Sequence, residues 1–176
     1  MVAEQSPFQP VLPFVGILFT DEILLRKALR RMEIVIPALV RASEPFPFDH
    51  TDYYNKEMIG NITRIWIASE QLADPSGLAD WKIASNAIEH ELASPEGRTV
   101  NIDPGFIGLP RVVLASCKGH PQRIPLRDGI YAETELIFRH EEWVNTPWTY
   151  RDYANSSAKK FFAEQREYLL KLLRRR

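Results

Sequence analysis

Polar side chains that could do chemistry are densest in residues 45–58, which read Pro-Phe-Pro-Phe-Asp-His-Thr-Asp-Tyr-Tyr-Asn-Lys-Glu-Met. Carboxylate and imidazole groups bind metal ions and transfer protons. The candidate catalytic residues here are Asp49, His50, Asp52 and Glu57, and Tyr53 is a candidate ligand-binding residue. Their spacing matches neither an EF-hand loop nor a His-Glu-x-x-His helix, so it does not identify a metal. The alternative is a polar loop in which Asp49 and Thr51 bond to backbone amides and the tyrosine rings pack on a sheet.

A second pair of polar residues stands at a predicted strand end. Asn101 and Asp103 lie two positions apart, so both side chains could point the same way. We expect Asn101 to orient a ligand and Asp103 to act as an acid, a base or an orienting group. The alternative is that Asp103 caps a turn at Pro104-Gly105.

The third group consists of Lys118, His120 and Arg123, which follow a predicted short helix. Two cations and a histidine could bind a phosphate or a carboxylate. Gly119 would let the backbone approach such a ligand closely. The alternative is that Lys118 only interacts with the last carbonyls of the helix.

A fourth set occupies a predicted strand, on which Tyr131, Glu133 and Glu135 share one face. Tyr131 and Glu133 are candidate ligand-binding residues, and the alternative is a face in contact with solvent. Cys117 has no activating motif around it and is interpreted as a small core residue.

Hydrophobic periodicity and turn residues predict the elements that position these groups. The expected strands are residues 11–19, 39–46, 62–69, 98–102, 123–126 and 130–138, with an Asp-Gly hairpin turn between the last two. The expected helices are 21–36 after a Thr20 cap, one from Asp74-Pro75 to Leu92, a short one over 109–119, and one capped by Ser156 or Ser157. The order is βαββαβ followed by αββα. It predicts an α+β fold with a mainly antiparallel sheet, begun by a ferredoxin-like split βαβ unit, with helices packed on one face.

Length and composition indicate the kind of protein that the sequence encodes. The 176 residues suit a single domain, with residues 1–10 as a loose arm. The 22 basic and 23 acidic residues give a net charge of −1, which argues against a nucleic-acid surface. The sequence contains no signal peptide and no apolar membrane span, so we expect a cytoplasmic protein. It also contains no zinc-type Cys/His set and no glycine-rich nucleotide loop, so it indicates no particular cofactor.

Several short segments carry a resemblance to a known family. They are Phe14-Val15-Gly16-Ile17-Leu18, residues 43–48, Thr51-Asp52-Tyr53-Tyr54 with Glu57-Met58, residues 101–105, Ile130-Tyr131-Ala132-Glu133, and Trp148-Thr149-Tyr150 with Asp152-Tyr153. In these segments, and over nearly the whole chain, the sequence resembles the bacterial and archaeal DUF4416 family, a domain of unknown function. The resemblance implies a shared pocket near the four polar groups and no particular activity.

We therefore expect a pocket that binds or acts on a small anionic or phosphorylated metabolite. Asp49, Asp52 and Glu57 would supply metal ligands or acid/base groups, Asn101 and Asp103 would orient, and Lys118, His120 and Arg123 would hold the anion. The alternative is a non-catalytic module for self-association or protein interaction. The first hypothesis requires the polar segments to converge on one cavity. Burial of Phe46, Phe48 and Tyr53 is also expected, because of the aromatic density of this stretch.

Overall fold

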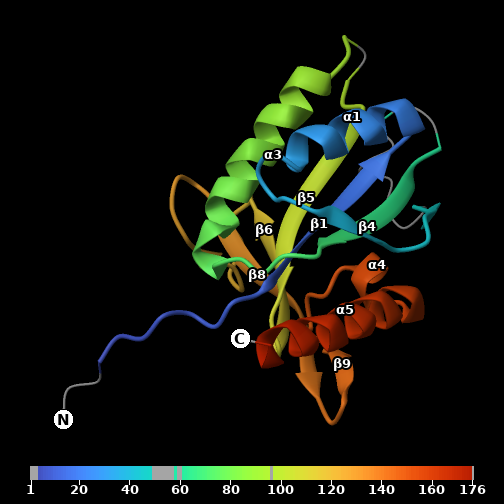
Figure 1. The fold of residues 1–176 in the computed structure, drawn as a ribbon. Helices are drawn as coiled ribbons and strands as arrows, with labels where there is room; N and C mark the ends of the chain where they lie inside the picture. The colour runs from blue at the N-terminus through green and yellow to red at the C-terminus, as the bar shows by residue number, and fades with distance from the viewer. Residues whose placement is uncertain (1–3, 49–57, 59–60, 96, 176) are drawn as a thin grey trace.

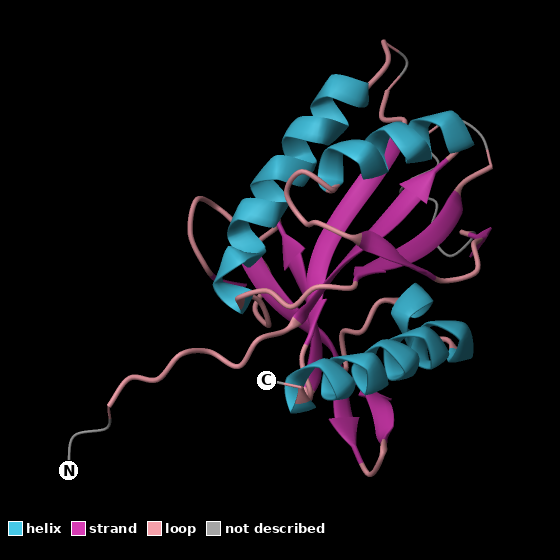
Figure 2. Ribbon diagram, in the orientation of Figure 1, coloured by secondary structure: helices cyan, strands magenta, loops and turns pink. Residues whose placement is uncertain are grey.

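An antiparallel sheet runs through the part of the chain that the computed structural model describes, which is residues 4–48, 58, 61–95 and 97–175. Its strands are β1 (Leu12–Phe19), β2 (Leu39–Ala42), β3 (Phe46–Pro47), β4 (Thr63–Ser69), β5 (Val100–Ile107), β6 (Arg111–Ser116), β7 (Ile124–Pro125), β8 (Tyr131–Arg139) and β9 (Glu142–Asn145). The helices are α1 (Glu22–Met32), α3 (Leu78–Leu92), α4 (Arg151–Ala154) and α5 (Ser156–Arg174), and a 3₁₀ turn, η1 (Pro75–Gly77), leads into α3. Figure 1 labels these elements, and Figure 2 colours them by type.

The strands are arranged in the order β2-β4-β1-β5-β6-β8-β7, with β3 paired to β4 and β9 paired to β8. Every described pair is antiparallel. The predicted α+β class with a mainly antiparallel sheet is therefore confirmed. The closer likeness to a ferredoxin-like unit stays a prediction.

Helices cover both faces of the sheet, so the expectation that they pack on one face was wrong. On one face, Val15 and Ile17 of β1 share a core with Met32 of α1 and Trp81 of α3. On the other, Phe14 belongs to a second core with side chains of α5, and its ring lies edge-on to that of Phe162, 5.2 Å away. All eight residues of β1 are buried. A strand that is apolar on both sides needs cover on both sides, which is why α5 lies opposite α1 and α3 (Figure 1).

Two boundaries around residue 104 differ from the sequence prediction. The helix expected over 109–119 is the strand β6, in which Val112 and Val113 face opposite cores. β-branched side chains suit such a doubly buried strand. The strand expected to stop at Ile102 continues as β5 through Asp103-Pro104-Gly105 to Ile107, so Asp103 caps no turn.

The capping residues of the helices agree with the sequence prediction at one helix and differ at two others. Asp74 caps η1 as predicted, whereas Asp21 replaces Thr20 at α1 and Asn155 replaces the two serines at α5. Asp128 and Gly129, with φ of 53° and 76°, form the predicted turn before β8. The short strand β9 was not predicted. Phe48 is buried and Phe46 is half-buried, whereas Tyr53 lies outside the described residues.

Gly105 marks a close approach that fixes the β5–β6 contact. A Cβ atom there would lie 2.4 Å from the carbonyl oxygen of Val113 and 2.6 Å from the Phe14 ring. We predict that Gly105→Ala lowers the free energy of unfolding by about 1–3 kcal/mol, because strand or ring must shift. The control is Gly108→Ala, where the nearest atom would be 3.6 Å from the new methyl group. Urea unfolding checks both variants, and equal losses would contradict the close-contact explanation.

Candidate functional site

The sheet separates between β5 and β6. Pairing of these strands is described only for Gly105–Ile107 with Val112–Leu114, although β5 begins at Val100 and β6 continues to Ser116. Pro104 stands where the pairing ends. It has no N–H group, and proline tolerates positions where a strand edge is unpaired.

Side chains of α3 replace β6 along this open edge. Glu89 Oε1 accepts a 2.7 Å hydrogen bond from the Ile102 N–H, and Lys82 Nζ donates to the Ile102 carbonyl at 3.0 Å. The N–H and C=O of one strand residue point to the same side, and this direction alternates along the strand. Pro104, two residues on, therefore also faces β6, and its missing N–H ends the ladder.

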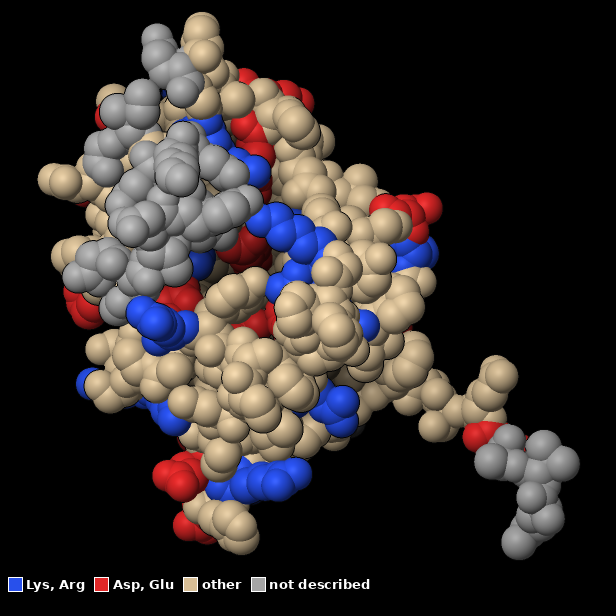
Figure 3. All heavy atoms as spheres, turned by 180° about the vertical axis from the view of Figure 1, so that it is seen from behind, with Lys and Arg blue, Asp and Glu red and all other residues tan. Residues whose placement is uncertain are grey.

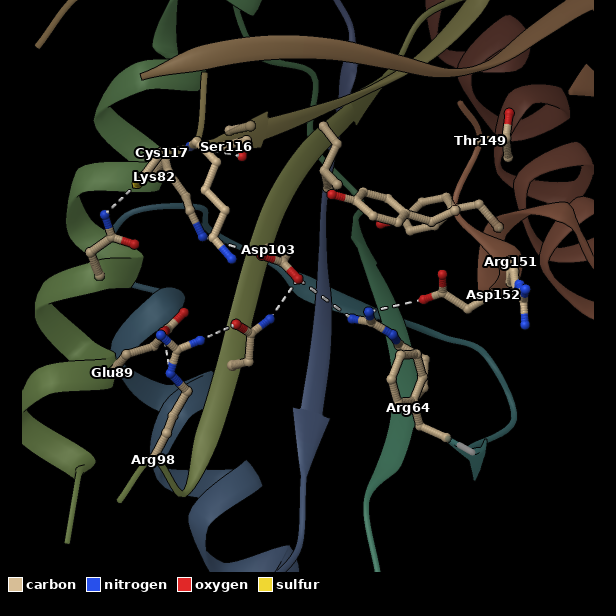
Figure 4. A pocket seen from close by; sticks show the side chains of 18 residues that line it. Arg64, Lys82, Glu89, Arg98, Asp103, Ser116, Cys117, Thr149, Arg151 and Asp152 are labelled. Atoms are coloured by element: carbon tan, nitrogen blue, oxygen red, sulfur yellow. Dashed lines mark hydrogen bonds and ion pairs between the residues drawn. The ribbon is translucent and has the colours of Figure 1, made fainter. Parts of the chain in front are cut away.

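The separation contains a cavity of about 620 Å³ that opens to solvent. Its wall includes residues of α3 on one side of the sheet and of α4 on the other (Figure 4). In the space-filling view, basic and acidic side chains gather around a hollow in this surface (Figure 3). The described residues that line the cavity include five basic side chains and three acidic ones: Arg64, Lys82, Arg98, Lys118 and Arg151 with Glu89, Asp103 and Asp152.

Asp103 lies at the centre of an ion network in this cavity (Figure 4). One carboxylate oxygen is 3.2 Å from Lys82 Nζ, and the other accepts a 2.6 Å hydrogen bond from Asn101 Nδ2 and lies 3.8 Å from Arg64 Nη1. Arg64 comes from β4 and must cross β1 to reach β5. It passes Gly16, the residue paired with Asp103, where a Cβ atom would lie 3.1 Å from Nη1.

Arg64 also connects the sheet to α4. Its Nη2 lies 2.9 Å from Asp152 Oδ2, and both side chains are 5% exposed, so this ion pair is shielded from solvent. Tyr153, the next residue, lines the cavity, and no described group hydrogen-bonds to its hydroxyl. Burial raises the pKa of Tyr153 well above its usual value, so the hydroxyl stays neutral.

Glu89 stands at the α3 wall of the cavity. Burial raises its pKa to about 6, and the nearby Lys82 charge opposes the shift. Glu89 Oε2 lies 3.6 Å from Arg98 Nε, and Arg98 Nη1 donates a 2.7 Å hydrogen bond to Asn101. Asn101 therefore connects this pair to Asp103.

A second buried acidic group lies behind the cavity wall on β8. A register shift between β6 and β8 leaves Glu135 as the extra residue, because Val113 pairs with Thr134 and Val112 pairs with Leu136. Glu135 Oε2 accepts a 2.9 Å hydrogen bond from the Tyr150 N–H, and Oε1 has no described partner. Burial raises the pKa of Glu135 to about 8, and the charges of Glu133 and Asp152 add to the shift.

The structure brings three of the predicted site residues to the cavity and places four others around it. Asn101, Asp103 and Lys118 line it. Arg123 forms an ion pair with buried Glu133 at 2.8 Å. It does not line the cavity, but it donates hydrogen bonds to three residues that do: Ser116, Lys118 through its carbonyl, and Tyr150. His120 is exposed beside Gln122, and Tyr131 is half-buried near Gly119. The predicted residues Asp49, His50, Asp52, Tyr53 and Glu57 lie outside the described residues.

Sequence reasoning missed Arg64, Lys82, Glu89 and Asp152. A usable signal existed for three of them. Arg64 is a charge inside an apolar strand, and Lys82 and Glu89 lie seven residues apart, on one face of α3 beside its apolar stripe. Asp152 lies in one of the segments that carry the family resemblance, but its residue type and spacing gave no indication of a site. Cys117, interpreted as a core residue, is exposed and lines the cavity.

Metal-binding clusters and membrane-spanning helices are both absent from the described part of the chain. Among those residues, no three His, Cys, Asp or Glu side chains gather as a metal site would require. No described helix combines the length and apolar character needed to cross a membrane.

Glu135 predicts a specific pH dependence of stability. Its pKa is about 8 in the folded protein against an ordinary 4.5, so between these values the folded chain holds a proton that the unfolded chain has lost. Stability must therefore fall as pH rises through this window. We expect Glu135→Gln to flatten the decline between pH 7 and 8, where Glu89, whose pKa is about 6, is mostly ionised. Urea unfolding at both pH values measures the slope. Glu164→Gln, on the exposed side of α5, should keep the wild-type slope, and an unchanged slope in Glu135→Gln would contradict the prediction.

Comparison with known proteins supports a family assignment. The family model for a domain of unknown function, DUF4416, matches residues 9–168, which include every described residue that lines the cavity. Comparison with curated proteins gives no match, and neither does comparison with solved structures. The match covers most of the chain and agrees with the resemblance seen in its motifs. The chain therefore belongs to the DUF4416 family.

Proposed function

We propose that the cavity between β5 and β6 binds a small molecule that carries an anionic group. The observation that carries this proposal is a buried lysine with a spare hydrogen-bond donor in the cavity wall. Lys82 is 6% exposed and lines the cavity, and its ammonium group bonds to the Ile102 carbonyl and to Asp103. An ammonium group has three N–H donors, so one remains for a ligand.

The charges of the wall support the same proposal. Basic side chains outnumber acidic ones among the described lining residues, and a cavity with such an excess attracts anions. Arg151 is exposed at the start of α4 and forms no ion pair with a described residue, so it is available to a ligand. Lys118 adds a further exposed cation.

Convergence of segments also favours a ligand site over an interaction module. Asn101, Asp103 and Lys118 come from two of the polar segments singled out in the sequence, and all three line the cavity. In an interaction module, by contrast, these segments would be dispersed.

The network suggests separate roles for the charged residues. Asp103 accepts from Asn101 and Lys82, so its oxygens are occupied and it positions the cations. Arg64 is engaged by Asp152 and holds α4 against the sheet. Lys82 is then the buried cation placed to contact the anion, and the exposed Lys118 and Arg151 add positive charge to the same wall.

Inorganic phosphate is the simplest probe of this proposal. We predict that phosphate raises the melting temperature of the wild-type protein, because a ligand at a hundredfold excess over its Kd stabilises the native state by about 2.7 kcal/mol. Arg151→Ala and Lys118→Ala should each weaken phosphate binding by about tenfold, which corresponds to ~1.4 kcal/mol. Calorimetric titration measures the Kd.

The matched control is Arg30→Ala, which removes an exposed arginine of α1 that does not line the cavity. It should bind phosphate as the wild type does. Equal weakening in all three variants would indicate a general charge effect and would contradict a site in the cavity.

A further inference from the structure

We infer that the ligand is a polyhydroxylated compound with a single anionic group, either a phosphate or a carboxylate. This inference rests on the proposed function, because it describes what fills the remainder of the same cavity. It is carried by the volume of the cavity, by the pairing of its carboxylates and by one aromatic ring in its wall.

The volume requires more than an inorganic anion. The cavity measures about 620 Å³, which lies within the range of ~300–1,000 Å³ that is usual for sites of drug-sized ligands. A lone phosphate would leave most of it to solvent. A ligand of drug-like or metabolite size fits this volume.

The charges of the cavity wall limit the ligand to one charged group. Asp103 lies 3.2 Å from Lys82, Asp152 lies 2.9 Å from Arg64, and Glu89 lies 3.6 Å from Arg98. No described carboxylate of the wall is left without a cation, so an ammonium group on the ligand would find no unpaired carboxylate there. The described wall has five basic and three acidic side chains, and its excess of two positive charges is balanced by one phosphate group of charge about −2. A second anionic group would exceed that balance, so the remainder of the ligand is neutral.

Neutral polar groups of the wall suit hydroxyl groups. Asn86 and Ser116 line the cavity and keep hydrogen-bonding capacity for a ligand. The Ser116 hydroxyl accepts from the Lys118 N–H and from Arg123, so it can still donate. Asn86 Nδ2 donates to Cys117 Sγ, which leaves the amide oxygen as an acceptor and one N–H as a donor, a pair that suits the hydroxyls of a sugar or sugar acid. A polar body of this kind would recover hydrogen bonds that an apolar body would leave unmade.

Tyr150 provides a rigid surface for the body of the ligand. Its ring lines the cavity and the residue is 44% exposed, yet it is fixed at two points. Its N–H donates to Glu135 Oε2 at 2.9 Å, and its hydroxyl accepts from Arg123 Nη2 at 2.7 Å. An exposed ring held in this way can pack against the C–H face of a sugar with little loss of side-chain entropy.

Paired probes test the ligand class. The affinities of ribose 5-phosphate and inorganic phosphate, and of gluconate and acetate, are measured by calorimetric titration with the full chain. We expect the hydroxylated member of at least one pair to bind at least tenfold more tightly than its simple anion, and the pair that shows this gain identifies the anionic group.

Variants of Tyr150 test whether its ring causes the tighter binding of the hydroxylated probe. Tyr150→Ala should weaken binding of the hydroxylated probe at least tenfold and change that of the simple anion less than twofold. Tyr150→Phe keeps the ring and should stay within threefold of the wild type. Trp148→Ala removes a comparably exposed aromatic residue that does not line the cavity, and it should bind both probes as the wild type does.

Three results would overturn the inference. If the simple anions bind but the hydroxylated probes bind no more tightly, the ligand class is wrong and the anion site stands. If no anion binds, the proposed function fails and this inference fails with it. If adenosine monophosphate binds more tightly than ribose 5-phosphate and loses that gain in Tyr150→Ala, the ring accepts an aromatic group, and the polyhydroxylated ligand is excluded.

Discussion

The missing N–H group of Pro104 is the constraint on which the rest of the site depends. A strand that could donate at this position would continue the ladder to β6 and close the sheet. Instead the ladder ends at Gly105, and the Ile102 N–H and C=O on the same edge need other partners. Glu89 and Lys82 supply them from α3, and in doing so they place a carboxylate and an ammonium group in the wall of a cavity. Backbone hydrogen bonding and site chemistry thus share the same two side chains.

The ion network around Asp103 joins elements on both faces of the sheet at one cavity. Lys82 of α3 bonds both to the Ile102 carbonyl and to Asp103. The other carboxylate oxygen of Asp103 lies 3.8 Å from Arg64, which pairs with Asp152 of α4. Gly16 makes this arrangement possible, since a larger residue would stand between Arg64 and Asp103. The resulting network is costly to desolvate and is sustained only by close pairing of its charges. The exposed side chains of Lys118 and Arg151 add positive charge to the wall of the cavity, which favours an anion.

Much of the fold could be predicted from local patterns, and the site could be predicted only in part. The apolar run of β1, the alternation of β4 and the Asp128-Gly129 turn are local signals, and the structure agrees with them. Asp103-Pro104-Gly105 misled because these residue types favour turns, and only the neighbours β1 and β6 show why they fit a strand. The same limit applies to α5, whose apolar stripe does not reveal which face of the sheet it covers. The sequence indicated Asn101, Asp103 and Lys118, which line the cavity. Arg64 and Asp152 form an ion pair although they lie 88 positions apart in the chain, and no spacing rule predicts such a pair.

Hydrogen exchange at the Ile102 amide tests most directly whether α3 side chains replace β6 along the open edge of β5. If they do, this amide is protected in the wild type, and Glu89→Ala lowers its protection at least tenfold relative to the amide of Ile107, which lies where β5 pairs with β1 and β6. A tenfold change corresponds to about 1.4 kcal/mol of opening free energy. Equal protection of Ile102 in the wild type and in Glu89→Ala, measured against Ile107, would contradict the replacement of β6 by Glu89 and with it the explanation of the cavity.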